Sequence, residues 1–238
     1  MKNKLHLLCL LLAVLVFITP TVRAEMYPFG FAFVAPKGQT PDTSSTIAGL
    51  CLGIYGEYEA IYGISLGGVF VTRELRGVQV SVFANDIKPE EAHNGNVDNL
   101  SFGLQIATFG NAYREDGKFV GMQFAINQNR HEGNGTFVGT QVSLLGNYSS
   151  GAKMYGFQAA IHGNGATNLS GFQIGIENWA KDLYGFQIGI YNKSKTLSGL
   201  QVGVWNHAET GAGVQIGIVN VCGAWGDARI LPLVNVVF

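Results

Sequence analysis

Charged side chains are scarce in this 238-residue sequence: they make up 13% of it, which is about half the usual share. A surface that faces water normally carries more charge. We therefore expect part of the exterior to face something other than water. Beyond residue 24, 12 basic residues are outnumbered by 16 acidic ones. No basic patch of the kind that binds nucleic acid is present, so nucleic acid is not an expected partner.

Proline is absent from residue 90 to residue 230, and only two cysteines, Cys51 and Cys222, follow residue 24. Proline would remove a hydrogen bond from a β-ladder, so its absence suits an uninterrupted sheet. Two cysteines do not make a disulfide framework. Whether they pair with each other is left open.

Catalytic motifs are also lacking. No G-x-S-x-G elbow or phosphate-binding loop occurs, and no histidine lies three or four residues from another. We therefore predict a protein that is not an enzyme and has no metal or cofactor. Acidic residues such as Glu57, Asp116 and Glu177 are scattered. They could converge across a barrel lumen, which keeps an outer-membrane barrel enzyme as a lower hypothesis.

The first 24 residues have the pattern of a secretory signal peptide. A basic start is followed by a short apolar stretch, and Val22 and Ala24 occupy the −3 and −1 positions of a cleavage site. The apolar stretch is shorter than the roughly 20 residues of a spanning helix. We expect cleavage after Ala24 and one β-repeat domain over 25–238.

The rest of the chain is dominated by one repeated phrase, for example GFQIGIYN at 185. Copies with the G-x-Q signature begin at residues 77, 103, 121, 139, 156, 171, 185, 199 and 213, so the repeats extend from about 77 to 220. Their spacing narrows from 26 residues to 14. Repetition on this scale indicates an array of one supersecondary unit.

Each copy alternates between apolar and small or polar residues. Phe186, Ile188 and Ile190 point to one side, and Gln187 and Gly189 to the other. This alternation is typical of a β-strand with one apolar face. The dipeptides Asp116-Gly117, Asn134-Gly135 and Asn164-Gly165 are typical of tight hairpin turns. Surface loops are expected at 85–99 and 127–135, and a last strand at 228–238, ending in Phe238.

The fold we predict from this pattern is an all-β, up-and-down antiparallel β-barrel of about 12 strands, built from 14–18-residue repeats, in an outer membrane. Its apolar face would meet membrane lipid, and a ladder of neutral glutamines would face the lumen. A structural or porin-like passage role follows, at the cell surface. The candidate lumen-facing ladder consists of Gln105, Gln123, Gln141, Gln158, Gln173, Gln187, Gln201 and Gln215.

A β-solenoid is the alternative, with apolar residues inside each coil and exposed Gln/Asn ladders that bind a partner. The constant 14-residue spacing of the last copies favours stacked coils. Ala180, Ser194, Ala208 and Cys222 share one place in the repeat and are all small. A soluble β-sandwich is a third possibility. The hairpin dipeptides and the terminal Phe238 favour the barrel.

The phrase G-[FLV]-Q-[IV]-G-[IV]-x-N, with the ending LPLVNVVF, resembles a bacterial family of exported surface-repeat proteins. The resemblance covers roughly residues 60–238 and is most specific in the last four copies. It implies an envelope location in a two-membrane bacterium. It implies no biochemical activity, ligand or functional residue.

Overall fold

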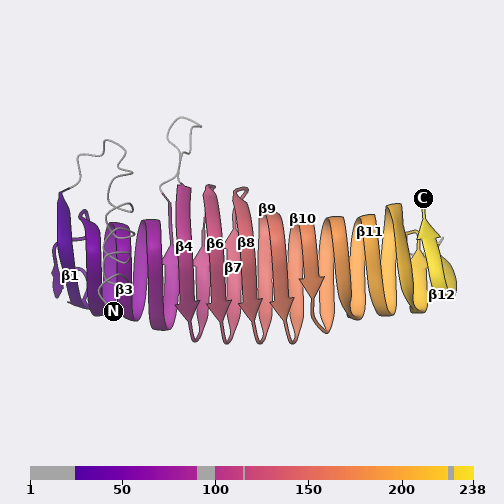
Figure 1. The fold of residues 1–238 in the computed structure, drawn as a ribbon, viewed down its shortest axis with the longest axis horizontal. Coiled ribbons are helices and arrows are strands. Elements are labelled where there is room, and N and C mark those ends of the chain that lie inside the picture. Colours follow the sequence, from indigo (N-terminus) through magenta and orange to yellow (C-terminus); the bar gives the residue numbers. More distant parts are fainter. Residues whose placement is uncertain (1–24, 90–99, 115, 225–227) are drawn as a thin grey trace, which may run out of the picture.

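The chain folds as a β-solenoid, in which successive copies of the repeat stack in parallel as coils along one axis (Figure 1). The computed structural model describes residues 25–89, 100–114, 116–224 and 228–238. The predicted signal peptide 1–24 and residues 90–99 of the predicted loop 85–99 lie outside these ranges. Among the described residues every regular element is a strand.

The strands, in chain order, are β1 (Met26–Val34), β2 (Gln39–Thr40), β3 (Thr46–Ile87), β4 (Leu100–Ala107), β5 (Gly110–Tyr113), β6 (Lys118–Ala125), β7 (Gln128–Glu132), β8 (Thr136–Ser143), β9 (Gly146–Ala160), β10 (Gly163–Ile174), β11 (Glu177–Cys222) and β12 (Arg229–Val237). The long elements β3 and β11 each wind through several coils. Between the two ends, each copy pairs in parallel with the copy before it and the copy after it.

The predicted antiparallel barrel is wrong. Gly171 pairs with Gly185 and Gln173 with Gln187 in a parallel ladder, and β4, β6, β8 and β9 continue the same register. The dipeptides interpreted as hairpin turns have other places: Asn164-Gly165 lies inside β10. Residues 127–135 are not one loop, because they contain β7. Gly117, Gly135 and Gly165 are not among the residues with positive φ, so these dipeptides do not form the tight hairpin turns that they suggested.

Each coil has two sides, which form two parallel sheets. One side is the G-x-Q copy, seen in β4, β6 and β8, and the other is the segment that follows it, seen in β5 and β7. A row of glycines separates the sides. Gly185 has a φ of +142°, and a Cβ there would lie 2.0 Å from the carbonyl oxygen of Gly171. Only glycine fits that approach.

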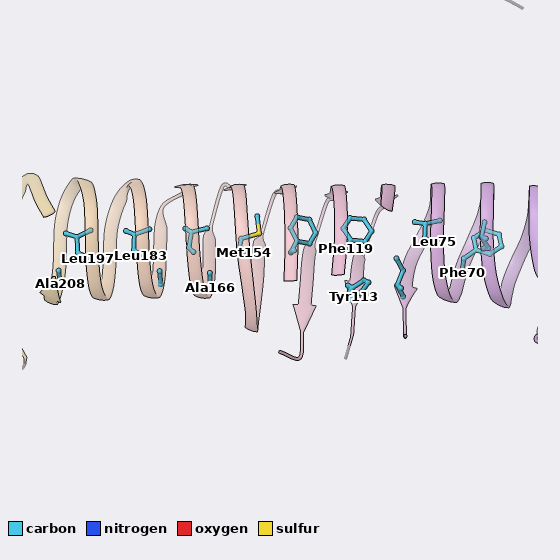
Figure 2. Packing of buried hydrophobic residues seen from close by; sticks show 14 of the residues in the cluster. Phe70, Leu75, Tyr113, Phe119, Met154, Ala166, Leu183, Leu197 and Ala208 are labelled. Atoms are coloured by element: carbon cyan, nitrogen blue, oxygen red, sulfur yellow. The ribbon is translucent and has the colours of Figure 1, made fainter. Parts of the chain in front are cut away.

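The hydrophobic core is a narrow column between the two sheets (Figure 2). Leu75, Phe119, Met154, Leu183 and Leu197 are all buried along it. A second row of core side chains comes from the sheet opposite the G-x-Q copies. Tyr113 belongs to this row near the middle of the column, and Ala166 and Ala208 belong to it toward the C-terminal end. This row of the core therefore changes from large to small side chains between the middle of the solenoid and its C-terminal end.

Two elements close the ends of the column. At the N-terminal end, β1 pairs in parallel with β3 and is itself covered in part by β2. At the C-terminal end, β12 reverses direction and pairs antiparallel with β11. The strand that ends near Phe238 is thus a cap for the last coil, where the sequence had suggested the closing strand of a barrel.

Candidate functional site

The eight predicted glutamines form one hydrogen-bonded ladder inside the coils, and Gln79 extends it by one rung. Nε2 of each of the eight donates to Oε1 of the glutamine in the preceding coil, over 2.8 to 2.9 Å, and Gln79 only accepts. All nine side chains are buried. Nδ2 of Asn235 in β12 donates to Oε1 of Gln215 and so caps the ladder at its C-terminal end.

A second ladder consists of the asparagines that end each copy. Here Nδ2 donates to Oδ1 of the asparagine in the following coil, over 2.8 to 2.9 Å, so the donors point the opposite way. The members, all buried, are Asn85, Asn111, Asn129, Asn147, Asn164, Asn178, Asn192, Asn206 and Asn220. Nδ2 of Asn192 also donates to the Val202 carbonyl, which satisfies a backbone group at the corner.

Burial of both ladders corrects two expectations. The glutamines do not line the lumen of a barrel, because the interior is filled by the ladders and the core. They also cannot contact a partner as the solenoid alternative supposed, since Gln187 and Asn192 are 0% exposed. The sequence did indicate which residues share one side of each copy, but that side is the inside of a coil.

What each coil presents outward on its G-x-Q side is apolar. We call this surface the apolar face; its exposed members are Leu52, Ile54, Ile64, Leu66, Val82, Ile106, Met122, Ile126, Leu144, Ile161, Phe172, Ile174, Ile176, Phe186, Ile188, Ile190, Val204, Ile216 and Ile218. Both end strands continue it. Phe31 of β1 pairs with Leu52, and Val234 of β12 pairs with Ile216.

No lysine, arginine or aspartate interrupts the apolar face. None of these three residue types occurs in the outward-facing segments, and Glu177 at a corner is the one acidic residue there. The segments are 49–55, 63–69, 77–83, 103–109, 121–127, 139–145, 156–162, 171–177, 185–191, 199–205 and 213–219. With strands about 4.8 Å apart and alternate side chains about 7 Å apart, the face covers on the order of 700 Å². Contiguous exposed apolar patches of this size mark interaction sites.

The opposite sheet carries the charges, and we call its outer surface the polar face. Nε of Arg114 lies 3.1 Å from Oδ1 of Asp86, and Arg130 lies 3.1 Å from Glu132. Farther along, Lys181 and Lys195 are exposed on the same sheet. Such exposed ion pairs stabilise the fold by at most about 1 kcal/mol each. Their main effect is to make the solenoid amphipathic.

One ionisable group lies in the core itself. His131 is 0% exposed, and neither of its ring nitrogens has a hydrogen-bond partner. Its ring stacks on Tyr113 at 4.8 Å between centroids and meets the edge of Phe137 at 5.9 Å. Burial lowers the pKa of His131 to about 4, because the charged imidazolium would lose its hydration.

Neither a metal site nor a disulfide is formed by the residues described. Within these ranges no three His, Cys, Asp or Glu side chains converge as metal ligands would. Cys51 and Cys222 are separate buried thiols, one beside β1 and one beside β12. Burial raises the pKa of the Cys51 thiol to about 11, so it is not reactive at neutral pH.

Comparison with protein-family models, with curated proteins and with solved structures finds no match for this chain. The resemblance to exported surface-repeat proteins therefore stays a prediction. In the part of the chain that the structure describes, no helix has the length and apolarity to cross a bilayer. The apolar face and the two buried amide ladders are the features from which function can be argued.

Proposed function

We propose that the protein is a non-enzymatic scaffold of the cell envelope that lies with its apolar face against a lipid membrane. The observation that carries this proposal is the uninterrupted apolar face, which runs from β1 to β12 and is free of Lys, Arg and Asp. A soluble protein that met only water would gain solubility from charges on that face.

Lipid fits this face better than a protein partner does. Protein interfaces carry about one hydrogen bond per 100–200 Å² and a polar rim, and the three outward rows of this face offer almost no polar side chain. Lipid requires none. The backbone beneath the face is already paired within the parallel ladders, so contact with hydrocarbon leaves no strand hydrogen bond unmade.

Aromatic rings with a polar atom flank the face at both corners. Tyr155 and Tyr184 directly precede the corner glycines and are about half exposed. Tyr191 directly follows the last outward apolar residue of its copy and is partly exposed. Tyr and Trp are enriched at the boundary between water and lipid, where the ring is apolar and its tip is wet.

The polar face then points away from the membrane, as in other structures that lie in the interface plane. The leader predicted over 1–24 supports export, and the resemblance to surface-repeat proteins supports the outer membrane of a two-membrane bacterium. The porin-like passage role is not retained, because the interior of the coils is closed by side chains.

Flotation with vesicles of phosphatidylethanolamine and phosphatidylglycerol tests the proposal on the purified mature chain. The wild type is expected to float with the vesicles. Ile188→Lys, which places a charge on the apolar face, should weaken binding by about tenfold, since a charge in this band costs over 1 kcal/mol. Ser150→Lys adds the same charge at an exposed site of the polar face and should bind like the wild type.

Two outcomes would overturn the proposal. One is a monomeric wild type that stays in the aqueous fraction. The other is a dimer in solution whose dissociation requires Ile188→Lys, because this would show that a second copy covers the face. Circular dichroism of each variant checks that the β-solenoid is intact, as expected for a side chain that is 45% exposed.

A further inference from the structure

A straight groove runs along the C-terminal half of the apolar face. Its volume is about 760 Å³, and it extends from Ile161 to Leu233 and Val234 of β12. Ile188 and Ile190 form its two walls in one coil, and Gly189 lies between them on the floor. The same three positions recur every 14 residues from Ile174 to Ile218, so the walls are continuous.

The floor of the groove is glycine backbone because the interior of the coil leaves no room for a side chain at these positions. A Cβ on Gly189 would point inward, 2.6 Å from Nδ2 of Asn178 and 2.2 Å from the Gly175 carbonyl oxygen. The asparagine ladder therefore keeps this row small. Because β10 and β11 pair without a bulge between Gly171 and Ile174, the walls stay in line from coil to coil.

From this shape we infer that the groove binds one extended, unbranched acyl chain parallel to the solenoid axis; the inference rests on the proposed function. The groove is open to solvent along its length, since its walls Ile188 and Ile190 are 45% and 55% exposed, and small-molecule sites normally combine apolar walls with a few polar groups. Here all the lining residues are Ile, Val, Leu or Gly. The part of the ligand that contacts the groove must then be hydrocarbon, since a polar group pressed against this lining would find no hydrogen-bond partner there.

Leu233 of β12 lies at the end of the groove. It pairs with Gly217 and has a φ of +66°, the one left-handed non-glycine residue in the described ranges. The pairing of β11 with β12 shifts register between Gly217 and Asn220, so this conformation belongs to a β-bulge. The bulge leaves the Leu233 side chain 72% exposed, where it can contact one end of the bound chain.

The groove is tested with palmitate, titrated calorimetrically into the wild type and two variants. Ile190→Trp places a large ring over the groove but keeps the face apolar, and it should weaken palmitate binding by at least about tenfold. Phe186→Trp is the matched control, because Phe186 lies on the same face outside the groove lining. Butyrate, which is too short to fill the groove, should bind none of the proteins measurably.

Vesicle flotation of the same three proteins separates this inference from the proposed function. If all three float and only Ile190→Trp loses palmitate, both stand. If all three float but bind palmitate equally, or not at all, the groove is overturned and the membrane contact stands. If only Ile190→Trp loses palmitate and no protein floats, the groove stands and the membrane proposal fails.

Leu233→Gly gives an independent reading. Glycine relieves the left-handed backbone, so the melting temperature should hold or rise while palmitate binding weakens several-fold through the lost end contact. Unchanged palmitate affinity in this variant would overturn the role of Leu233 at the groove end.

Discussion

The amide of Gln187 is fully buried and bonded on both sides. Its Nε2 donates to Oε1 of Gln173, and its Oε1 accepts from Nε2 of Gln201, each over 2.8 Å. Each hydrogen-bonded glutamine fills the interior of its coil, as an apolar side chain would, and it also fixes the register between neighbouring coils. A shift by one residue would put an isoleucine against the ladder.

Replacing Gln187 by leucine should lower the free energy of unfolding by about 3 kcal/mol, since it leaves buried amide atoms of two neighbouring rungs without their partners. Urea denaturation measures the change. Ile188→Ala, one residue away on the exposed side, should change stability by less than about 1 kcal/mol. Equal losses in the two variants would show that the ladder contributes nothing specific.

His131 makes stability depend on pH. Its pKa is about 4 in the folded chain and about 6.5 when unfolded, so only the unfolded chain binds a proton between these values. Stability is therefore full above pH 6.5 and falls as the pH drops toward 4. The loss from this one group is about 3 kcal/mol at pH 4.

The variant His131→Phe isolates that contribution. Phenylalanine can keep the stack on Tyr113 and carries no proton, so its unfolding free energy should fall less than that of the wild type between pH 7 and pH 4. The difference between the two slopes is the quantity to measure by urea denaturation at each pH. Parallel slopes would mean that His131 is already charged in the folded core or that its site takes up water.

Glycine corners decide whether one coil can lie on the next. In Gly185→Ala the new Cβ would meet the Gly171 carbonyl oxygen at 2.0 Å, in a backbone conformation that alanine avoids. We expect a loss of about 3 kcal/mol or more in thermal or urea unfolding. Gly163→Ala is the matched control, because its nearest contact would be 3.4 Å away. A tolerated Gly185→Ala would contradict the close stacking of the corners.

The sequence predicted which residues form strands and which side of each strand is apolar. It did not predict whether neighbouring strands run parallel or antiparallel. The alternation in GFQIGIYN correctly placed Phe186, Ile188 and Ile190 on an outward apolar side and Gln187 inside. Parallel and antiparallel neighbours satisfy that alternation equally well, and Asn164-Gly165 suits a ladder corner as well as a hairpin. The hairpin dipeptides and the terminal Phe238 favoured a barrel, whereas the solenoid alternative was expected to bury the apolar side.

The groove and His131 show a second limit of sequence reasoning. Gly189 reads as a small residue on the inward side, and only the packed coil shows that the asparagine of the preceding rung occupies its space. His131 lay in a stretch interpreted as a polar loop, because Gln128, Asn129 and Glu132 surround it. Its burial follows from the pairing of β5, β7 and β9, which is a tertiary property.

At the scale of the whole molecule, the solenoid is a stack in which each coil contacts only its neighbours. Deleting residues 185–198 removes one complete coil and joins Tyr184 to Gly199, so Gln173 would meet Gln201 in the same register. We expect a folded protein with β-type circular dichroism and a modestly lower melting temperature. Deleting residues 192–198 removes half a coil and should abolish folding. Failure of both deletions to fold would show that the coils are not interchangeable.

The opposed direction of the two amide ladders has an electrostatic consequence for the stack. In an α-helix the peptide dipoles add along the axis and leave partial charges at the two ends. Here the glutamine donors point toward the N-terminal end and the asparagine donors toward the C-terminal end, so the two rows of side-chain dipoles largely cancel. Lengthening the molecule by further coils would therefore build up little field from these side chains, and neither tip would need a counter-ion on their account.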